Sequence, residues 1–332
     1  MEELSRFLSC DWGTSSFRLR IVDSKSYEII AERVSKEGNA EIFKKWRKTQ
    51  QPEGARLSFY LDVIRRHISD LEREQGSLIE LPVLVSGMAS STIGMMDLPY
   101  KELPFNIDGS DLNTHKLEKS SHLRKELFLI SGARTETDVM RGEETQLVGC
   151  MLQNESQDQL FVHPGTHSKH VMIRNGKAVS LKTFMTGELF SILSSESILA
   201  SSVKQGGDLK DPFNMKSFEK GVKDAVNGSL LNLLFMVRTN ELFRKFTAGQ
   251  NYFYLSGLLI ASELTTLQAD FKGRIILAGE DILTSSYLKA FEIMQIDRHV
   301  SGVQTIGGDL ITARGQLEIF KKFSAQSKAK TN

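Results

Sequence analysis

Hydrophobic and polar positions alternate along the strands that the N-terminal sequence predicts. Phe17, Leu19 and Ile21 alternate with two arginines, a period of two that is typical of a strand with one buried face. This pattern, together with short apolar runs bounded by turns, predicts strands at residues 6–11, 17–23, 27–34, 81–87, 126–132, 159–165 and 274–279. A hairpin is expected over residues 170–181, because Asn175-Gly176 is a strong two-residue turn signal.

Apolar residues at steps of three and four predict helices. Over residues 55–75, such steps place five side chains on one helical face, namely Leu57, Leu61, Ile64, Ile68 and Leu71. Residues 140–152 are also expected to be helical, with acids in the first turn, where the helix dipole favours negative charge. Further helices are predicted at residues 187–200, 215–246, 251–268 and 281–294.

The order of these elements indicates two α/β domains. Strands come in runs of three, followed by alternating strands and helices, and the pattern restarts after the polar stretch "QNESQD" at 153–158. A chain of 332 residues agrees with two domains at roughly 150 residues each. We therefore expect an N-terminal domain at 1–155, a C-terminal domain at 156–325, and a flexible basic tail at 326–332.

Charge and composition narrow the class of protein. The chain has 42 basic and 41 acidic residues, so a net charge of +1 supplies no bulk attraction to nucleic acid or anionic membranes. No apolar run approaches the roughly 18 residues of a membrane span, and "MEELSR" lacks the order of a signal peptide. Two cysteines, Cys10 and Cys150, give no disulfide framework. We expect a cytoplasmic protein with neither nucleic-acid nor membrane partners.

A short motif occurs twice, once at the head of each predicted domain. "CDWGTSSFRLRIV" at 10–22 and "VHPGTHSKHVMIR" at 162–174 both run strand, Gly-Thr-x-Ser, strand. The identical pairs are Gly13 with Gly165, Thr14 with Thr166, Ser16 with Ser168, and Ile21 with Ile173. Because the identities stand at the start of matching units, we interpret them as an internal duplication.

The chemistry of these turns favours phosphate binding. Glycine lets backbone N–H groups approach a ligand, hydroxyl side chains add donors, and successive N–H groups form a concavity for anions. Two such turns facing each other across a cleft would grip a polyphosphate from both sides. Asp11 in the first copy is predicted to hold Mg²⁺ through water, and Lys169 in the second to supply a point charge. The structural alternatives are an ordinary hairpin and a turn-forming aspartate.

Other common nucleotide and hydrolase motifs are absent from the sequence. It contains no GxxxxGK[ST], no GxGxxG, no GxSxG and no HExxH. A P-loop and the usual dinucleotide fingerprint are therefore excluded.

Six stretches, in order along nearly the whole chain, resemble the 2-dehydro-3-deoxygalactonokinase family of the sugar kinase, Hsp70 and actin superfamily. They are "DWGTSSFRL" (11–19), "SGM" (86–88), "DVMRGEETQLVG" (138–149), "HPGTHSK" (163–169), "FMTGELFSIL" (184–193) and "YLSGLLIASE" (254–263). The resemblance implies two RNase H-like domains of the actin-like ATPase kind with a central nucleotide cleft. It also implies ATP, Mg²⁺ and transfer of a phosphoryl group to the C6 hydroxyl of 2-dehydro-3-deoxy-D-galactonate, a step in galactonate breakdown.

The same resemblance suggests the catalytic base. "RGEETQLVG" looks like the Gly-Asp-Gln-Gln segment that carries the catalytic aspartate of related carbohydrate kinases, which places the base at Glu143. Glu144 is the alternative, because a shift of one residue matches nearly as well. On a helix the two side chains point about 100° apart, so only one can face the substrate. The structural alternative is a pair of acids that complements a helix N-terminus.

Other residues are assigned to the ligands in the same way. The phosphate-binding candidates are Gly13, Thr14, Ser15, Ser16, Gly165, Thr166, His167, Ser168 and Lys169. Gly279 and Glu280 are expected beside adenosine, although Glu280 also fits a solvated loop. The substrate candidates are Ser86, Gly87, Met88, Arg141 and Glu188. Arginine binds carboxylates with two parallel hydrogen bonds, and Arg134 is the alternative to Arg141. Met88 also fits packing, and Glu188 also fits a helix cap.

Three alternatives stay open at this point. His163, His167 and His170 lie within eight residues, but no cysteine or further histidine pair lies nearby to complete a zinc site. An actin-like or Hsp70-like ATP switch would share the phosphate turns. A kinase of a neutral sugar or polyol would fit the missing Gln-Gly-Trp after "SGM" and the His170 that stands where the family has tryptophan. The sequence leaves the oligomeric state open, a homodimer included.

Overall fold

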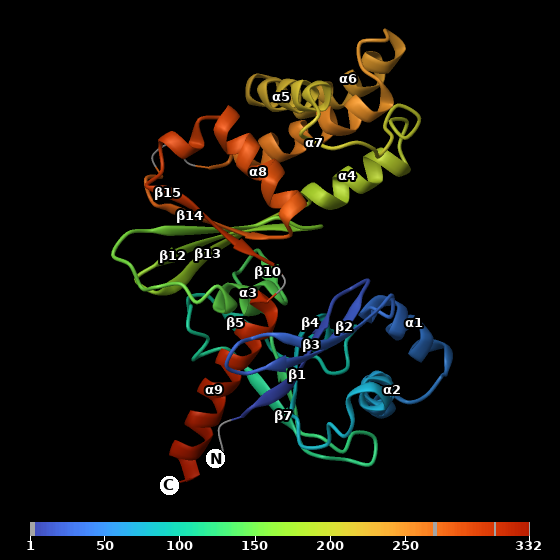
Figure 1. The fold of residues 1–332 in the computed structure, drawn as a ribbon, viewed down its shortest axis with the longest axis vertical. Coiled ribbons are helices and arrows are strands. Elements are labelled where there is room, and N and C mark those ends of the chain that lie inside the picture. The colour runs from blue at the N-terminus through green and yellow to red at the C-terminus, as the bar shows by residue number, and fades with distance from the viewer. Residues whose placement is uncertain (1–3, 268–270, 309, 332) are drawn as a thin grey trace. The chain divides into compact units, whose positions relative to one another are not determined.

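The computed structural model describes residues 4–267, 271–308 and 310–331, and they form two compact units (Figure 1). Unit 1 comprises Met1–Glu155, Ile173–Leu181 and Gly308–Asn332, and unit 2 comprises Ser156–Met172 and Lys182–Gly307. The chain therefore leaves unit 1 after Glu155, inside the stretch where the sequence placed the boundary. The expected second domain, 156–325, differs from unit 2, because two of its segments belong to unit 1.

The main sheet of unit 1 has the strand order β3-β2-β1-β4-β8-β7. β1 pairs antiparallel with β2 and parallel with β4, while β2–β3 is antiparallel and β4–β8 is parallel. The bounds are β1 Arg6–Trp12, β2 Phe17–Asp23, β3 Ile29–Ser35, β4 Val83–Gly87, β7 Thr114–Leu117 and β8 Leu127–Ile130. The sequence predicted five of these strands to within two residues and missed β7.

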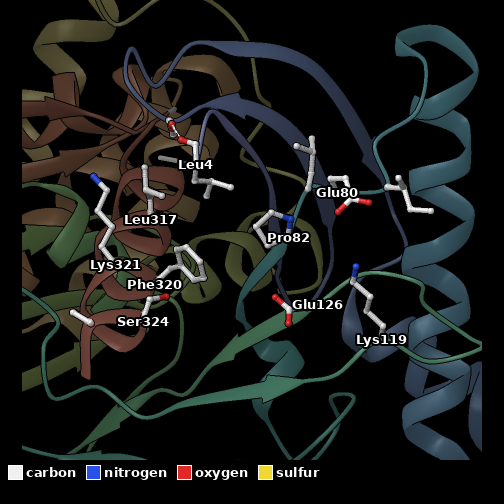
Figure 2. Close-up of a pocket in the computed structure, with 13 residues that line it drawn as sticks. Leu4, Glu80, Pro82, Lys119, Glu126, Leu317, Phe320, Lys321 and Ser324 are labelled. Carbon is white, nitrogen blue, oxygen red and sulfur yellow. Dashed lines mark hydrogen bonds between the residues drawn. The ribbon is translucent and has the colours of Figure 1, made fainter. Parts of the chain in front are cut away.

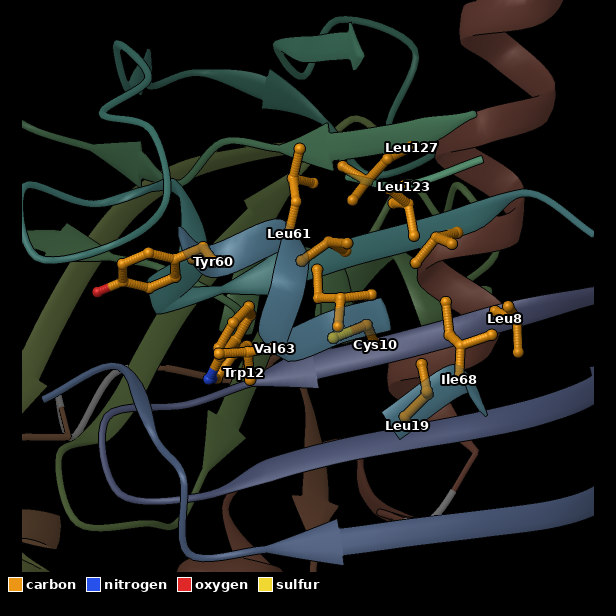
Figure 3. Packing of buried hydrophobic residues seen from close by; sticks show 14 of the residues in the cluster. Leu8, Cys10, Trp12, Leu19, Tyr60, Leu61, Val63, Ile68, Leu123 and Leu127 are labelled. Atoms are coloured by element: carbon orange, nitrogen blue, oxygen red, sulfur yellow. The ribbon is translucent and has the colours of Figure 1, made fainter. Parts of the chain in front are cut away.

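Helices cover both faces of this sheet. Successive strand residues point to opposite faces, so Leu8 packs in one core and Phe7 in another. The first core joins the strands to α2, Arg56–Gln75, as Figure 3 shows for Leu8, Cys10 and Trp12 beside Tyr60 and Ile68. The second core joins Phe7 and Phe128 to Leu317 of α9, Ile311–Thr331.

α9 corrects two expectations from the sequence, the flexible tail and the extent of the second domain to residue 325. The segment 326–332 was expected to be a flexible tail, but the helix continues to Thr331. Its apolar residues Leu317, Phe320 and Phe323 recur at steps of three and pack with Phe128, which anchors the helix on unit 1. This packing explains why the last segment of the chain belongs to unit 1.

The remaining elements of unit 1 are short, apart from one helix that the sequence analysis missed. The missed helix is α1, Asn39–Lys48. The helix predicted at 140–152 is only α3, Glu143–Gly149, because Val139–Met140 forms a strand and Gly142 has a φ of +117°. The short strands are β5 Lys101–Glu102, β6 Phe105–Asn106, β9 Ala133–Arg134 and β10 Val139–Met140.

The sheet of unit 2 repeats the strand order of unit 1. Its order is β15-β14-β11-β12-β13, which, like β8-β4-β1-β2-β3, places the first strand of the unit beside the second and the fourth. The bounds are β11 Gln159–His163, β12 Ser168–Arg174, β13 Lys177–Phe184, β14 Arg274–Gly279 and β15 Gly302–Gly307. The tip of the β12–β13 hairpin belongs to unit 1, where β13 pairs with β6. The RNase H-like fold class that the sequence predicted is confirmed in both units.

Five helices accompany this sheet within the described part of unit 2. They are α4 Thr186–Ser195, α5 Pro212–Asn227, α6 Leu230–Leu242, α7 Ala248–Leu264 and α8 Asp281–Ile293. The single helix expected at 215–246 is two helices, because Gly228 is extended and α6 begins two residues later. α5 and α7 approach closely, since a Cβ on Gly221 would lie 2.2 Å from the Tyr254 carbonyl oxygen. No helix among the described residues has the length and apolar character of a membrane span.

Candidate active site

The first turn, Gly13–Ser16, connects β1 to β2 and presents its middle to solvent. The Gly13 N–H donates to the Ser16 carbonyl at 2.9 Å, and the three residues after Gly13 are exposed. The Gly13 and Thr14 carbonyls accept the backbone N–H groups of Asn39 and Ala40, at 2.9 and 3.1 Å. The start of α1 therefore holds the carbonyl side of the turn, which leaves the N–H and hydroxyl groups of the three residues after Gly13 for a ligand.

Glycine is required where α1 meets this turn. A Cβ on Gly38 would lie 2.3 Å from the Thr14 carbonyl oxygen, a distance that no side chain can occupy. The second turn, Gly165–Ser168, is held in the same way within unit 2. The Glu188 N–H at the start of α4 donates to the Thr166 carbonyl at 3.0 Å, and a Cβ on Gly187 would lie 2.5 Å from the Gly165 carbonyl oxygen. The two turns thus share their support as well as their sequence.

Asp11 lies one residue before the end of β1, between Arg18 of β2 and Ser86 of β4. Burial raises the pKa of Asp11, Arg18 and Arg20 lower it, and the nearby Glu143 raises it. Among the described residues, no donor forms a hydrogen bond with the Asp11 carboxylate. A partly buried acid without a protein donor beside a second acid is a suitable place for a cation.

Two glycines with positive φ bring this acid next to the start of α3. A Cβ on Gly87, where φ is +88°, would lie 2.8 Å from the Trp12 carbonyl oxygen and 3.5 Å from Asp11 Oδ1. A Cβ on Gly142, where φ is +117°, would lie 3.4 Å from the Gly87 Cα. Asp11, Gly87 and the residues around Gly142 therefore converge within unit 1.

The two candidate bases have different surroundings. Glu144 is fully buried, accepts the Gly142 N–H at 2.8 Å and is 3.0 Å from the Thr145 hydroxyl. Burial, and then the neighbouring Glu143, raise the pKa of Glu144 to about 7. Glu143 is only half-buried, and one of its carboxylate oxygens accepts the Arg141 N–H at 2.9 Å. Of the two candidates, Glu143 is the one that is partly exposed.

Arg141 lies over the ring of Tyr100 with its guanidinium carbon 4.0 Å from the ring centroid. Its Nη1 donates to the carbonyl and the hydroxyl of Ser90, and its Nε donates to the Tyr100 hydroxyl at 3.3 Å. The remaining nitrogen, Nη2, is 3.9 Å from Asp97, which is beyond hydrogen-bond distance. Arg141, Tyr100 and Asp97 line a cavity of about 630 Å³, and Arg134 borders it.

The three residues of the "SGM" segment have different surroundings. Ser86 is fully buried, and its hydroxyl accepts a hydrogen bond from Gln316 of α9 at 2.9 Å. The sequence analysis assigned this hydroxyl to the sugar, but the structure buries it against Gln316. Met88 is half-buried and begins a 3₁₀ turn that ends at Ser90, a partner of Arg141. Gly87 is the member that lies beside Asp11.

The second turn is partly buried. Thr166 and His167 are exposed, and His167 Nε2 lies 2.5 Å from a Glu188 carboxylate oxygen. Ser168 and Lys169 are buried, and the Ser168 hydroxyl lies 3.0 Å from that of Tyr287 in α8. The ligand-accessible part of this turn is therefore shorter than the sequence suggested.

The adenosine candidates lie where β14 meets α8. Gly279 ends the strand, and the exposed Glu280 precedes the helix without a side-chain capping bond. A small cavity of about 110 Å³ next to the second turn is lined by Gly165, Gly187, Leu283 and neighbouring side chains. The second turn and the start of α8 thus border one mostly apolar cavity within unit 2.

The three clustered histidines have different neighbours. His163 Nδ1 lies 2.8 Å from the Ala278 carbonyl, His167 pairs with Glu188, and His170 Nε2 lies 2.8 Å from Glu263. They do not converge on one point. No three metal-ligating side chains come together anywhere in residues 4–267, 271–308 and 310–331.

The comparison with protein families decides what this site belongs to. Residues 11–317 match the family described as 2-keto-3-deoxy-galactonokinase. The chain belongs to this family. It is therefore a sugar kinase, with a nucleotide and a sugar-type compound as substrates, and the predicted assignment to the 2-dehydro-3-deoxygalactonokinase family of sugar-acid kinases is confirmed.

Individual members of the galactonokinase family show how far the similarity extends. The chain is 31% identical over 293 residues to "Probable 2-dehydro-3-deoxygalactonokinase DgoK1" of Rhizobium meliloti (strain 1021), covering 86% of this chain and 89% of the relative. It is 27% identical to the 2-dehydro-3-deoxygalactonokinase of Escherichia coli (strain K12), over 92% of this chain and 94% of that protein. A crystal structure from Sinorhizobium meliloti, described as "a putative 2-dehydro-3-deoxygalactonokinase protein", has a TM-score of 0.74 at 25% identity, covering 96% of this chain and 99% of that one.

A larger cavity of this galactonokinase-family protein, about 790 Å³, lies elsewhere in unit 1 (Figure 2). Pro82, at the entry to β4, lines one side, and Leu317 and Phe320 of α9 line another. None of the predicted site residues borders it. This cavity lies at the amino end of β4, whereas ligand loops in α/β sheets follow the carboxyl ends of the strands.

Two functional candidates were missed at the sequence level. Gln316 accepts from the Ser9 hydroxyl at 2.6 Å and donates to the Cys10 carbonyl and to Ser86 at 2.9 Å, which ties α9 to β1, the strand of Asp11, and to its neighbour β4. Glu263 is buried among polar partners behind the second turn. An acid within the apolar run of "YLSGLLIASE" was a visible signal for Glu263, whereas nothing in the sequence linked Gln316 to a strand about 300 residues earlier.

Proposed function

We propose that this protein transfers the γ-phosphoryl group of ATP to the C6 hydroxyl of 2-dehydro-3-deoxy-D-galactonate, a step in galactonate breakdown, in the cytoplasm. Two relatives of similar length carry names that give them this substrate. The observation that carries the proposal is the convergence of Asp11, Gly87 and the Gly142–Glu143 segment within unit 1. It brings a candidate metal-binding carboxylate and a candidate base to one place.

Glu143 is the proposed base. The C6 oxygen attacks the γ-phosphorus, the bond from phosphorus to the bridging oxygen of ADP breaks, and the hydroxyl proton passes to the Glu143 carboxylate. Glu143 is half-buried at the first position of α3, whereas the carboxylate of Glu144 is enclosed by Gly142 and Thr145. The surroundings of the two acids therefore favour Glu143.

Asp11 is the proposed holder of Mg²⁺. Its carboxylate receives no hydrogen bond from the described residues, so its oxygens are available to a cation or to the water around one. Mg²⁺ keeps several waters and takes few protein carboxylates, which suits a site with one or two acids. The ion would neutralise charge on the phosphates of ATP when bound.

Both turns are proposed to bind phosphate groups. In the first turn, Thr14, Ser15 and Ser16 are exposed after Gly13, and their carbonyl side is held by α1. In the second, Gly165, Thr166 and His167 carry the accessible groups, while the buried Ser168 and Lys169 support the turn from behind. Gly279 and Glu280 are proposed beside the adenosine, next to the apolar cavity of unit 2.

The sugar acid is proposed to lie in the 630 Å³ cavity of unit 1. Arg141 Nη2 is the guanidinium nitrogen without a short hydrogen bond, so it is available to the substrate carboxylate. The stacking on Tyr100 and the bonds to Ser90 fix its direction. Gly87 and Met88 stay substrate candidates through the 3₁₀ turn that joins them to Ser90, the partner of Arg141. Glu188, which pairs with His167, is assigned to support of the second turn rather than to the sugar.

The test is a substrate screen with ATP and Mg²⁺. We expect ADP release that depends on 2-dehydro-3-deoxy-D-galactonate and falls for stereoisomers and for neutral sugars of the same length. ADP release that no sugar acid changes would favour the ATP-switch alternative. A neutral sugar as the best substrate would favour the polyol-kinase alternative and would remove the role proposed for Arg141.

A further inference from the structure

Glu263, near the end of α7, holds a buried carboxylate at the centre of a polar cluster in unit 2. The residue is 3% exposed. Its Oε2 accepts hydrogen bonds from the Tyr287 hydroxyl, at 2.7 Å, and from the Thr186 hydroxyl. Its Oε1 lies 2.8 Å from His170 Nε2. A buried carboxylate with three polar partners is satisfied, and the partners are fixed in turn.

The cluster continues to the second turn itself. The Ser168 hydroxyl lies 3.0 Å from the Tyr287 hydroxyl. Because the Tyr287 proton is directed to Glu263, the Ser168 hydroxyl is the donor in this second bond. A chain of hydrogen bonds therefore runs from Ser168 through Tyr287 to Glu263, and burial, followed by the Glu263 charge, raises the pKa of Tyr287 well above its ordinary value.

The partners of Glu263 come from the three elements that border the second turn. His170 follows the turn on β12. Thr186 is the first residue of α4, whose Glu188 N–H holds the Thr166 carbonyl. Tyr287 belongs to α8, which begins directly after Glu280. One carboxylate thus connects the strand after the turn, the helix that holds the turn, and the helix that follows the proposed adenosine residues.

We infer that Glu263 is a positioning residue for nucleotide binding: it fixes the second turn relative to the starts of α4 and α8 without touching ATP. The inference rests on the proposed function of the second turn as a phosphate-binding turn. It adds a residue outside the turn, and a hydrogen-bond chain through Tyr287, to the residues that decide the affinity for ATP.

Substitution by glutamine tests the charge and the acceptor pattern at nearly constant shape. A carboxylate only accepts hydrogen bonds, whereas an amide has one oxygen and one NH₂ group. In Glu263→Gln, at least one of the three partners meets an N–H group, so either His170 must change tautomer or a hydroxyl must turn away. Tyr287→Phe removes both hydrogen bonds of the Tyr287 hydroxyl, the one to Glu263 and the one to Ser168, and so disconnects Glu263 from Ser168 and α8. Thr186→Val removes the link to α4, and Thr186→Ser retains it.

Unit 2 contains a matched control. Tyr254 of α7 is also buried and donates its hydroxyl to a carboxylate, Asp224 of α5, at 2.8 Å. Neither residue belongs to the second turn, to α4 or to α8. Tyr254→Phe therefore removes the same kind of bond from the same unit and reports the purely structural cost of losing it.

The experiment compares the affinity for the Mg²⁺ complex of a non-hydrolysable ATP analogue with the thermal unfolding midpoint of each full-length variant. We expect Glu263→Gln and Tyr287→Phe to weaken nucleotide binding by about tenfold, which corresponds to the loss of roughly one buried hydrogen bond. Thr186→Val should behave alike and Thr186→Ser should be near wild type. The KM for the sugar acid should change by less than about twofold in folded variants, and Tyr254→Phe should lower the midpoint without changing nucleotide affinity.

Two results would overturn the inference. One is wild-type nucleotide affinity in a folded Glu263→Gln protein. The other is a loss of affinity that follows the unfolding midpoint equally in Tyr287→Phe and Tyr254→Phe, which would mean a general structural effect. A wild-type protein that binds the nucleotide but phosphorylates no sugar acid would refute the proposed substrate, while the comparison of affinities would still decide the role of Glu263.

Discussion

Both carboxylate oxygens of Glu144 accept the backbone N–H of Gly142, at 3.0 and 2.8 Å. This relationship folds the second acid of "GEET" back over the start of its own helix. The carboxylate is thereby excluded from solvent, and burial followed by the charge of Glu143 raises its pKa to about 7 from an ordinary value of 4.5. The first acid is left as the one that faces outward.

Glu144 should therefore make the protein less stable as the pH rises. Between pH 4.5 and about 7, the folded protein keeps a proton on Glu144 that the unfolded chain has lost. Stability falls through that window and levels off above it. Glu144→Gln is neutral throughout, so its free energy of unfolding relative to wild type should rise across the window by up to about 3 kcal/mol. Urea unfolding of both proteins between about pH 5 and 8 measures this.

The exposed Glu136, in the loop between β9 and β10, supplies a control with the same change of side chain. Glu136→Gln should follow the wild-type dependence on pH. A constant difference between Glu144→Gln and wild type at every pH would contradict the raised pKa.

Glu143→Gln should lower kcat by about 10²–10⁴-fold, the usual contribution of a general base. The KM for ATP should stay near the wild-type value, because the carboxylate acts on the hydroxyl proton rather than on the nucleotide. Steady-state kinetics with 2-dehydro-3-deoxy-D-galactonate measures both constants, again with Glu136→Gln as the matched charge control. Wild-type kcat in Glu143→Gln would remove Glu143 as the base.

Gly87 should tolerate no side chain, because a Cβ would collide with the Trp12 carbonyl. Gly76 has a similar φ without such a collision, so it separates the effect of the collision from that of backbone strain. Gly87 and Gly76 have φ of +88° and +80°, but an added Cβ would meet the Trp12 carbonyl at 2.8 Å in the first and nothing within 4 Å in the second. Alanine at either position costs about 1–2 kcal/mol for the left-handed backbone. Only Gly87→Ala should also displace Asp11 and lower kcat/KM.

Stability and activity of the two glycine variants are measured side by side, by urea unfolding and by ADP release. Equal activity of Gly87→Ala and Gly76→Ala would mean that the approach to Asp11 has no functional consequence.

The sequence predicted most of the sheet strands because their signal is local. Alternation in β2 and the Asn175-Gly176 turn depend on neighbouring residues alone, and the duplicated Gly-Thr-x-Ser located both turns. The residues that hold the turns were not predicted, because Gly38 and Gly187 become special only when a helix start approaches a carbonyl. That approach is set by tertiary packing.

The candidate site shows the same division. Asp11 and Glu143 were identified from motifs, and the structure brings them together. The preference for Glu143 over Glu144 rests on the different burial of the two side chains, and the sequence alone does not show which of two adjacent acids is buried. Ser86 was assigned to the sugar from the "SGM" motif at the end of a strand, and its hydrogen bond to Gln316, 230 residues away in the chain, was not predicted. Long-range polar contacts of this kind leave no periodic pattern.

Arg141→Lys should distinguish the contribution of the guanidinium geometry to substrate binding from the contribution of the positive charge. Lysine keeps the charge but cannot bond Ser90 and stack on Tyr100 while directing a further N–H into the cavity. We expect the KM for the sugar acid to rise by about tenfold or more, with the KM for ATP unchanged. Arg134, which borders the same cavity and pairs with Glu102 at the surface, provides the comparison. A larger effect of Arg134→Lys would mean that Arg134, rather than Arg141, binds the substrate carboxylate.

Gly38→Ala and Gly187→Ala should each weaken nucleotide binding, although neither residue belongs to a phosphate turn. Their Cβ atoms would lie 2.3 Å from the Thr14 carbonyl and 2.5 Å from the Gly165 carbonyl. Backbone atoms cannot move aside as the end of a flexible side chain can. The turn must therefore shift, and its N–H groups no longer point at the phosphate. We expect the affinity for the ATP analogue to fall by about tenfold in each variant.

Gly54→Ala in unit 1 and Gly206→Ala in unit 2, where an added Cβ meets nothing within 4 Å, should bind as wild type does. Because the two variants alter the same support in different units, a loss in only one of them would show that the other turn does not bind phosphate.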